Sequence, residues 1–187
     1  MPGSPGLAVG RAAMIVLALG SNLAGPWGPP ERTLNRTLDL LYDCCIPVRQ
    51  CSSLLRTAPY GKTDQPAFLN AVAIVETHLP PAALMRRLHA IEYAAGRRRR
   101  LRWGPRTLDL DLVAYHDLVI PPPRHPLPDS ALRRPLALPH PDLHRRAFVL
   151  EPLNEIAPFW HHPVTGLTPR QMLLALPPGA GGRVVAR

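Results

Sequence analysis

The sequence predicts an α+β fold in which two helices pack on an antiparallel sheet. Apolar residues recur with strand and helix periodicity in the order β-α-β-β-α-β along residues 14–115. The chain has 187 residues, of which 46% are hydrophobic and 19% charged, which suits a single domain with a substantial core. This order of elements is that of a ferredoxin-like βαββαβ sandwich.

The first half of the pattern reads as strand, helix, strand. Residues 14–20 are apolar throughout, which predicts a central strand. Leu34, Leu38 and Leu41 then recur at helical spacing. The stretch at residues 11–20 also resembles a short signal peptide. A turn and a helix start follow it in place of a cleavage site, and this favours the buried strand.

The second half repeats the pattern as strand, helix, strand. Residues 68–77 are apolar and rich in β-formers, and residues 107–115 alternate strictly between apolar and polar. Between them, a pair of prolines opens a helix that Gly96 closes. The expected strands lie at residues 14–20, 48–56, 68–77 and 107–115, and the expected helices at residues 29–45 and 81–96.

The remaining segments are less regular. We expect residues 1–13 to be a flexible N-terminal extension, with Met14 as an alternative functional start, and residues 14–187 to form one domain. Other expected features are a loop at 57–66, a basic loop at 97–105, a Pro-rich insertion at 116–139, a helical turn and strand-like run at 144–153, and a weakly specified tail after 166.

Composition narrows the class of protein. The net charge is +9, and Lys62 is the only lysine. A basic chain of this kind suits a polyanionic partner: nucleic acid, a membrane surface or a phosphorylated small molecule. No run approaches the ~18 apolar residues of a membrane span. The three cysteines (Cys44, Cys45 and Cys51) have neither disulfide-framework nor metal-site spacing, so we expect reduced thiols and a cytoplasmic protein.

Two carboxylates stand two residues apart in the last expected strand. Side chains alternate faces along a strand, so the leucines around them point to the core while Asp109 and Asp111 project together from the other face. The strand rise places their Cβ atoms about 6–7 Å apart. Neighbouring carboxylates repel unless a cation lies between them, and Mg²⁺ prefers such oxygen ligands. The pair predicts a Mg²⁺ site, with an ordinary solvated strand face as the alternative.

Arginines gather directly before this carboxylate pair. They crowd residues 97–102, and Arg106 stands three residues before Asp109. Guanidinium groups match phosphate oxygens in two-point contacts, so this loop suits a nucleoside triphosphate. The alternatives are a solvated loop and an Arg-rich RNA-binding module, although the first and third strands carry no paired aromatics for stacking bases. Glu92, near the end of the second helix, either pairs with an arginine of this loop or faces solvent.

Aromatic and polar residues elsewhere predict a second half of the site. Phe68 and Asn70 lie two residues apart on an expected strand and therefore share one face. An amide beside an aromatic ring suits a flat heterocycle that forms hydrogen bonds. His140 and Arg146 belong to another polar cluster. Phe148 is either a second aromatic residue that lines the heterocycle site or a residue of the hydrophobic core.

One run of residues is highly specific: RWGPRTLDLD at residues 102–111. The other informative segments are Ala18–Leu23, Arg56–Pro59, Gln65-Pro66 with Phe68–Asn70, Leu138–His140 and Arg146–Phe148. Together, in this order, they resemble the 6-hydroxymethyl-7,8-dihydropterin pyrophosphokinase family over about residues 14–166.

The resemblance implies a ferredoxin-like α+β fold and transfer of the diphosphate of ATP to the pterin hydroxymethyl group, releasing AMP, in folate biosynthesis. It implies ATP and 6-hydroxymethyl-7,8-dihydropterin as small-molecule substrates, two Mg²⁺ ions, no nucleic-acid or membrane partner, and a monomer. The metal ligands it implies are Asp109 and Asp111, which form the catalytic set together with Arg97 and Arg106. The implied ATP-site residues are Glu92, Arg97, Arg99, Trp103, Arg106, Leu112, His140 and Arg146. The implied pterin-site residues are Thr57, Pro59, Phe68, Asn70 and Phe148.

The chain departs from the family pattern at several positions. Phe68 stands where tyrosine is usual, which removes a hydroxyl but keeps the stacking face. Pro141 follows the histidine where tyrosine is common, and Tyr60 stands where leucine is usual. The segment between Asp111 and His140 is longer than usual, so the resemblance defines the ribose and adenine contacts less well than the metal site. The loop at 97–103 resembles a mobile lid.

Overall fold

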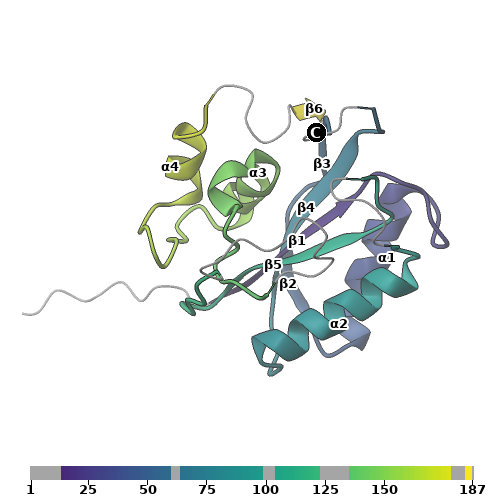
Figure 1. Ribbon diagram of the computed structural model, residues 1–187, viewed down its shortest axis with the longest axis horizontal. Coiled ribbons are helices and arrows are strands. Elements are labelled where there is room, and N and C mark those ends of the chain that lie inside the picture. Colours follow the sequence, from purple (N-terminus) through teal and green to yellow (C-terminus); the bar gives the residue numbers. More distant parts are fainter. Residues whose placement is uncertain (1–13, 60–63, 99–103, 123–134, 178–183, 187) are drawn as a thin grey trace, which may run out of the picture.

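The fold is built on one antiparallel sheet with helices on both of its faces. The computed structural model describes residues 14–59, 64–98, 104–122, 135–177 and 184–186. Figure 1 shows α1 and α2 on one side of the sheet and α3 and α4 on the other. The strands are β1 (Ile15–Ser21), β2 (Val48–Cys51), β3 (Leu55–Thr57), β4 (Phe68–Val75), β5 (Asp109–Tyr115) and β6 (Val184–Ala186). The α-helices are α1 (Pro30–Asp43), α2 (Pro81–Ala94), α3 (Ala147–Ile156) and α4 (Pro169–Leu174), and a 3₁₀ turn spans Leu143–Arg145.

The sheet has β1 near its centre. β1 pairs antiparallel with β4 on one side and β5 on the other. The strand order is β5-β1-β4-β3-β6, and β2 also pairs with β4. The prediction of an α+β fold with an antiparallel sheet and helices packed on it is therefore confirmed.

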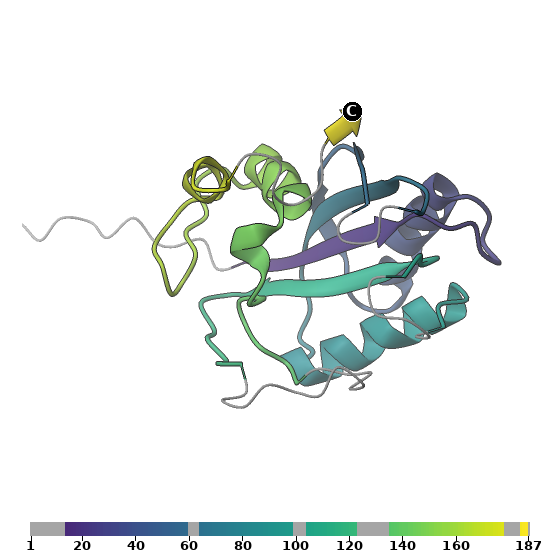
Figure 2. The ribbon, with the colours of Figure 1, turned by 45° about the horizontal axis from the view of Figure 1, so that its top comes forward.

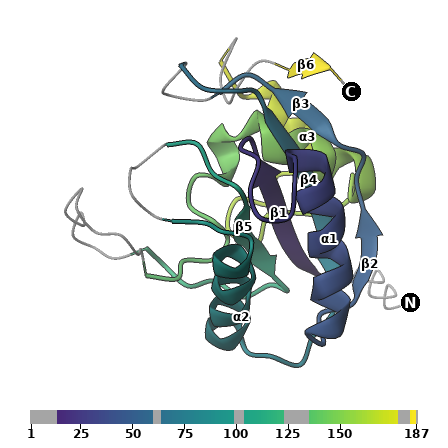
Figure 3. The same ribbon diagram turned by 90° about the vertical axis from the view of Figure 1, so that its right-hand side faces the viewer.

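Alternation along β1 separates two cores. Ile15, Leu17 and Leu19 point toward α1 and α2 and belong to the larger core cluster. Val16 and Ala18 point the other way and pack with residues of α3 and α4. Figure 3 shows α1 and α2 side by side on their face of the sheet, and Figure 2 shows α3 and α4 on the opposite side from α2. The burial of both sheet faces explains why β1 is apolar throughout.

The strand expected at residues 48–56 is two short strands. Between them the Ser52 hydroxyl accepts the Val72 backbone N–H at 3.0 Å, a bond that a strand carbonyl would otherwise accept. Ser53 then donates its backbone N–H and its hydroxyl to the carboxylate of Glu155 on α3, at 2.8 and 2.7 Å. Serine side chains thus replace the sheet ladder where the chain passes beneath α3.

The strand-like run expected at residues 144–153 is wrong. Residues Leu143–Arg145 form a 3₁₀ turn, as expected of a helical turn, but α3 follows in place of a strand. Val149, Leu150 and Leu153 have helical spacing and are buried against the sheet.

The tail is better defined than the sequence indicated. Thr168 and Gln171 form a capping box at the start of α4. β6 pairs antiparallel with β3 at the edge of the sheet. In the Pro-rich insertion, Ile120 and Leu138 form an isolated bridge. Residues 1–13 and 123–134 lie outside the described part of the chain.

Candidate active site

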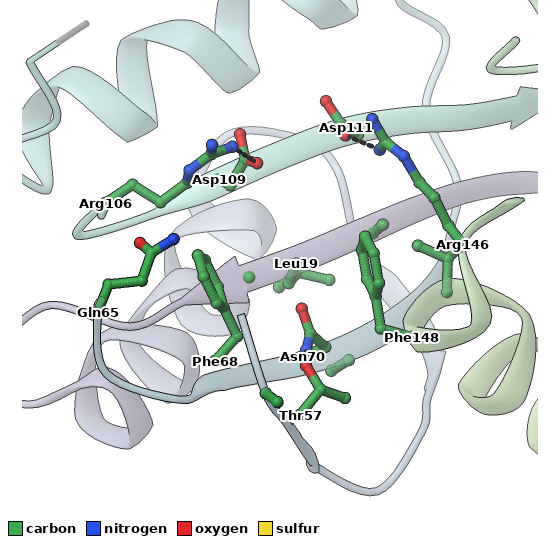
Figure 4. A pocket seen from close by; sticks show the side chains of 15 residues that line it. Leu19, Thr57, Gln65, Phe68, Asn70, Arg106, Asp109, Asp111, Arg146 and Phe148 are labelled. Carbon is green, nitrogen blue, oxygen red and sulfur yellow. Dashed lines mark hydrogen bonds and ion pairs between the residues drawn. The ribbon is translucent and has the colours of Figure 1, made fainter. Parts of the chain in front are cut away.

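A pocket opens on the sheet face that α3 only partly covers. Strands β1, β3, β4 and β5 form its floor, and the start of α3 forms one wall (Figure 4). The predicted site residues that line it are Thr57, Phe68, Asn70, Arg106, Asp109, Asp111, Arg146 and Phe148. The structure thus brings together residues from four separate stretches of the sequence.

The two carboxylates lie on the pocket side of β5, as their alternation predicts. Each carboxylate forms an ion pair with at least one arginine. Asp109 forms ion pairs with Arg97 and Arg106, and Arg146 donates to Asp111 at 2.6 Å. These three arginines come from the end of α2, the loop before β5 and the start of α3, so they surround the pair from three sides.

The electrostatics keep the Asp109 carboxylate ionised. Burial alone would raise the pKa of Asp109, but Arg106 and Arg97 outweigh it, so the pKa lies well below the ordinary aspartate value. Burial and the nearby Arg146 lower the pKa of His140. The His140 imidazole, with its Nε2 3.9 Å from Asp111, is therefore neutral near pH 7 and forms no ion pair.

The end of α2 delivers Arg97 to the carboxylates. Gly96 has a φ of +84°, and a Cβ there would lie 2.6 Å from the Cδ of Pro26, so only glycine suits the turn. The guanidinium of Arg97 then bridges Glu92 and Asp109. Glu92 is 2% exposed, so its pairing with Arg97 resolves the alternative left open by the sequence.

Glu92 also joins α2 to β5. Its carboxylate accepts the backbone N–H of Leu110 at 2.9 Å, between the two aspartates. Glu92 acts behind the carboxylate pair and is not among the pocket-lining residues. Its position makes it a support for Arg97 and for the strand that carries both aspartates.

The other half of the pocket carries no charge. Thr57 pairs with Phe68 across β3 and β4, and the Asn70 amide donates to the Thr57 hydroxyl at 2.8 Å. Phe68 and Phe148 face the pocket from β4 and α3, with Asn70 between them (Figure 4). These two rings and the amide form a slot suited to a flat, hydrogen-bonding molecule.

Arginines connect the two halves. The Arg106 guanidinium carbon lies 6.0 Å from the centre of the Phe68 ring. The corresponding carbon of Arg146 lies 5.9 Å from the Phe148 ring. Each aromatic ring therefore has a guanidinium that also pairs with one of the two carboxylates.

Some predicted residues lie elsewhere. Leu112 is 3% exposed and packs in the core beneath α1 and α2, because strand alternation turns it away from the aspartates. Its side chain does not line this pocket, although the family resemblance implied a place for Leu112 in the ATP site. Pro59 is also absent from the lining, although it follows two residues that belong to it. Arg99 and Trp103 lie outside the described residues.

Sequence reasoning missed one polar lining residue. Gln65 lies at the rim beside Phe68 and Arg106. Gln65 belongs to one of the motif segments. It lies in an expected loop, however, where no periodicity predicts which side chains lie near it, so the sequence indicated no role for it. The backbone of Gly20 also forms floor, and a Cβ there would lie 3.3 Å from Asn70 Oδ1.

The donor set fits Mg²⁺ better than a closed protein metal site. No group of three or more His, Cys, Asp or Glu side chains gathers for a metal among the described residues. Two carboxylates on one strand face match the few protein ligands that Mg²⁺ takes when phosphate oxygens and waters complete its shell.

Fold and pocket together define a transferase that handles a phosphorylated substrate. Residues 16–158 match the sequence model of the 7,8-dihydro-6-hydroxymethylpterin-pyrophosphokinase (HPPK) family. The chain therefore belongs to this family, as its motifs predicted.

Individual relatives agree. The chain is 40% identical over 144 residues to the 2-amino-4-hydroxy-6-hydroxymethyldihydropteridine pyrophosphokinase of Pseudomonas aeruginosa. This match covers 77% of the present chain and 80% of the Pseudomonas protein. It is 38% identical over 159 residues to the enzyme of that name from Synechocystis, covering 84% and 73%. The RNA-binding alternative finds no support in these matches.

A solved structure supports the fold. A Plasmodium falciparum HPPK-DHPS triple mutant superimposes with a TM-score of 0.67 at 16% identity. The match covers 87% of this chain but 43% of the larger protein.

Proposed function

We propose that this chain transfers the diphosphate of ATP to the hydroxymethyl group of 6-hydroxymethyl-7,8-dihydropterin and releases AMP, a step of folate biosynthesis. The observation that carries the proposal is that the arginine-ringed Asp109 and Asp111 open into the same pocket as the Phe68–Phe148 slot. One pocket thus offers a phosphate side and a heterocycle side. The names of the relatives support this pairing of substrates.

The pterin lies in the uncharged half. Phe68 and Phe148 contact the faces of the ring, and the Asn70 amide and Thr57 hydroxyl hydrogen-bond to its edge. Because Asn70 already donates to Thr57, its carbonyl oxygen is oriented as an acceptor for a pterin N–H. The missing hydroxyl at Phe68 leaves this stacking role intact.

The triphosphate lies in the charged half. Asp109 and Asp111 would hold two Mg²⁺ ions, which neutralise phosphate charge and orient the β-phosphorus. Arg97, Arg106 and Arg146 then turn from the carboxylates to the phosphate oxygens, and Glu92 keeps the Arg97 side chain close. His140 remains a neutral hydrogen-bonding group at the nucleotide side.

The reaction is an in-line substitution at phosphorus. The pterin hydroxyl oxygen bonds to the β-phosphorus, the bond to the α,β-bridging oxygen breaks, and AMP leaves. We assign Asp109 as the acceptor of the hydroxyl proton, although its lowered pKa makes it a weak base. Positioning and charge neutralisation by the arginines therefore supply most of the rate enhancement.

The finer expectations belong to the same proposal. The protein acts as a cytoplasmic monomer. Among the described residues, no helix has the length and apolarity to cross a bilayer.

The direct test incubates the protein with ATP, Mg²⁺ and 6-hydroxymethyl-7,8-dihydropterin and separates the nucleotides. We expect AMP and the pterin diphosphate in equal amounts, and no AMP when the pterin is left out. Release of ADP would indicate transfer of a single phosphoryl group and overturn the proposal. Salt-sensitive RNA binding without pterin-dependent turnover would return the RNA-binding alternative.

A further inference from the structure

Asn22, directly after β1, lies between two chain segments that each contribute a residue to the pocket. It is 2% exposed, yet it was assigned no role by its motif. The chain segments before β4 and before β5 both meet it. Those segments carry Gln65 and Arg106, which line the pocket on its aromatic and phosphate sides.

The side-chain amide of Asn22 bonds to both segments. Its Nδ2 donates to Gln65 Oε1 at 3.1 Å and to the Pro66 carbonyl at 3.0 Å. Its Oδ1 accepts the backbone N–H of Arg106 at 2.8 Å. Its own backbone N–H donates to the Arg106 carbonyl at 3.1 Å. Both amide donors and the acceptor are thus used across loops far apart in the sequence.

These bonds link residues on opposite sides of the site. On one side, Arg106 pairs with Asp109. On the other, Gln65 and Pro66 lead directly into Phe68. Because a buried amide with three partners is costly to break, a shift of either segment changes the geometry that the other segment prefers.

We propose that Asn22 is a positioning residue that couples pterin binding to nucleotide binding. The inference rests on the proposed function and adds to it a route by which each substrate strengthens the binding of the other. The route is a shared hydrogen-bonded side chain that lines neither substrate slot. By linkage, the coupling is the same in both directions.

Asn22→Asp tests the route selectively. A carboxylate keeps the acceptor for the Arg106 N–H but has no donor for the Pro66 carbonyl. Gln65 can rotate its amide toward the new carboxylate, whereas a carbonyl cannot become a donor. The variant therefore breaks the bond to the Pro66 carbonyl, which holds the backbone that leads into Phe68, and retains the bond to Arg106 on the phosphate side.

The measured quantity is a coupling factor. Calorimetry gives the Kd of 6-hydroxymethyl-7,8-dihydropterin with and without a non-hydrolysable Mg–ATP analogue, and the ratio of the two is the factor. We expect about fivefold or more in the wild type and a value within about twofold of one in Asn22→Asp, the usual scale of coupling between sites. A merely structural role would change both Kd values and leave their ratio intact.

Ser21→Ala is the matched control. The buried Ser21 hydroxyl donates to the Thr107 carbonyl at 2.6 Å. Its removal therefore breaks a bond to the segment before β5, which also contains Arg106, and leaves the contacts of residues 65–66 unchanged. This variant is expected to lower the Tm and keep the wild-type coupling factor. If Asn22→Asp does not fold, Asn22→Ser removes the amide donors with a smaller electrostatic change.

The outcomes separate the two proposals. Wild-type protein that binds neither ligand contradicts the proposed function itself. Binding of both ligands with no coupling in the wild type, or with unchanged coupling in a folded Asn22 variant, overturns the role of Asn22 and leaves the function standing. Loss of coupling in Ser21→Ala as well would assign the effect to local stability and also overturn it.

Discussion

The two halves of the pocket are held in place by different forces. On the uncharged side, Thr57 and Phe68 are neighbours in the β3–β4 ladder, and a hydrogen bond joins Asn70 to Thr57. On the charged side, Asp109 and Asp111 are held by arginines that come from outside β5. Packing and ladder bonds keep their arrangement when a ligand binds, whereas ion pairs can exchange partners.

The difference shows which half is already formed. In the uncharged half, Phe68 and Phe148 line the pocket from elements held by ladder bonds and packing. In the charged half, the groups that would serve the metal and the phosphates form ion pairs with each other. Variants in the charged half should therefore act mainly on turnover, and variants in the uncharged half should act mainly on pterin affinity.

The largest effect is expected for Asp111→Asn. The amide keeps the size of the side chain but removes the anion that pairs with Arg146 and would hold Mg²⁺. We expect turnover to fall by about 10³-fold with the fold intact, the scale seen when one charge-stabilising group is lost. AMP release measures turnover, and circular dichroism reports the fold.

Asp117→Asn provides the same chemical change on an exposed turn beyond β5. It should leave turnover unchanged. Near-normal turnover in Asp111→Asn would remove the metal assignment, and with it the distinction between the halves.

The next largest effect is expected for Arg97→Ala, which should lower kcat by about 10²-fold. Arg97 bridges Glu92 and Asp109, and its loss leaves the buried Glu92 with one cation fewer. Arg97→Lys keeps the charge but not the two-point fork, so only partial recovery is expected. Single-turnover kinetics with saturating ATP separate this loss from weaker binding.

The neighbouring Arg98 is the control for this position. Its guanidinium lies over the exposed Tyr93 ring and away from the carboxylates. Arg98→Ala should retain wild-type kcat. An equal loss in both variants would mean that general positive charge, and not the Arg97 bridge, sets the rate.

The sequence predicted the strand-borne parts of the site better than the parts that tertiary contacts assemble. Strand alternation placed Asp109 with Asp111, and Phe68 with Asn70, because a period of two needs no knowledge of the rest of the fold. It also turns Leu112 toward the core, as found.

The links across the site could not be read from the sequence. The contacts of Asn22 with residues 65–66 and 106 span 43 to 84 positions, and no local pattern encodes them. The helix that carries Phe148 was missed for a related reason: an apolar run of that length fits a strand or a helix until the partner surface is known.

On the uncharged side, Thr57→Val should weaken pterin binding with a smaller effect. Valine has the shape of threonine but leaves the buried Asn70 amide without its acceptor. We expect the Kd for pterin to rise about tenfold, which corresponds to one lost buried hydrogen bond. The Kd for the ATP analogue should stay unchanged in the same calorimetric titration.

Ser53→Ala tests whether this effect is specific to the slot. It removes a hydroxyl contact between the β2–β3 junction and Glu155 outside the pocket. Pterin binding should be unaffected. A parallel loss of ATP affinity in Thr57→Val would show that the halves are not separable, and so break the comparison.

The smallest effect is expected for an ion pair outside the pocket. Arg49 and Glu76 pair at 2.5 Å, but their side chains are 59% and 62% exposed. The hydrogen bond from Arg49 lowers the pKa of Glu76, so any stabilisation is present above about pH 4.3, the ordinary glutamate value, and is lost as the pH falls through the folded-state pKa.

Because solvent screens this pair, Glu76→Gln should leave the Tm unchanged within error at pH 7 and at pH 3. The pocket arginines differ in being mostly buried, so their ion pairs are screened much less. Thermal melts of wild type and variant at the two pH values check this. A Tm lowered by several degrees at pH 7 but not at pH 3 would show that an exposed pair also stabilises the fold, and burial alone would no longer separate the pocket's ion pairs from those of the surface.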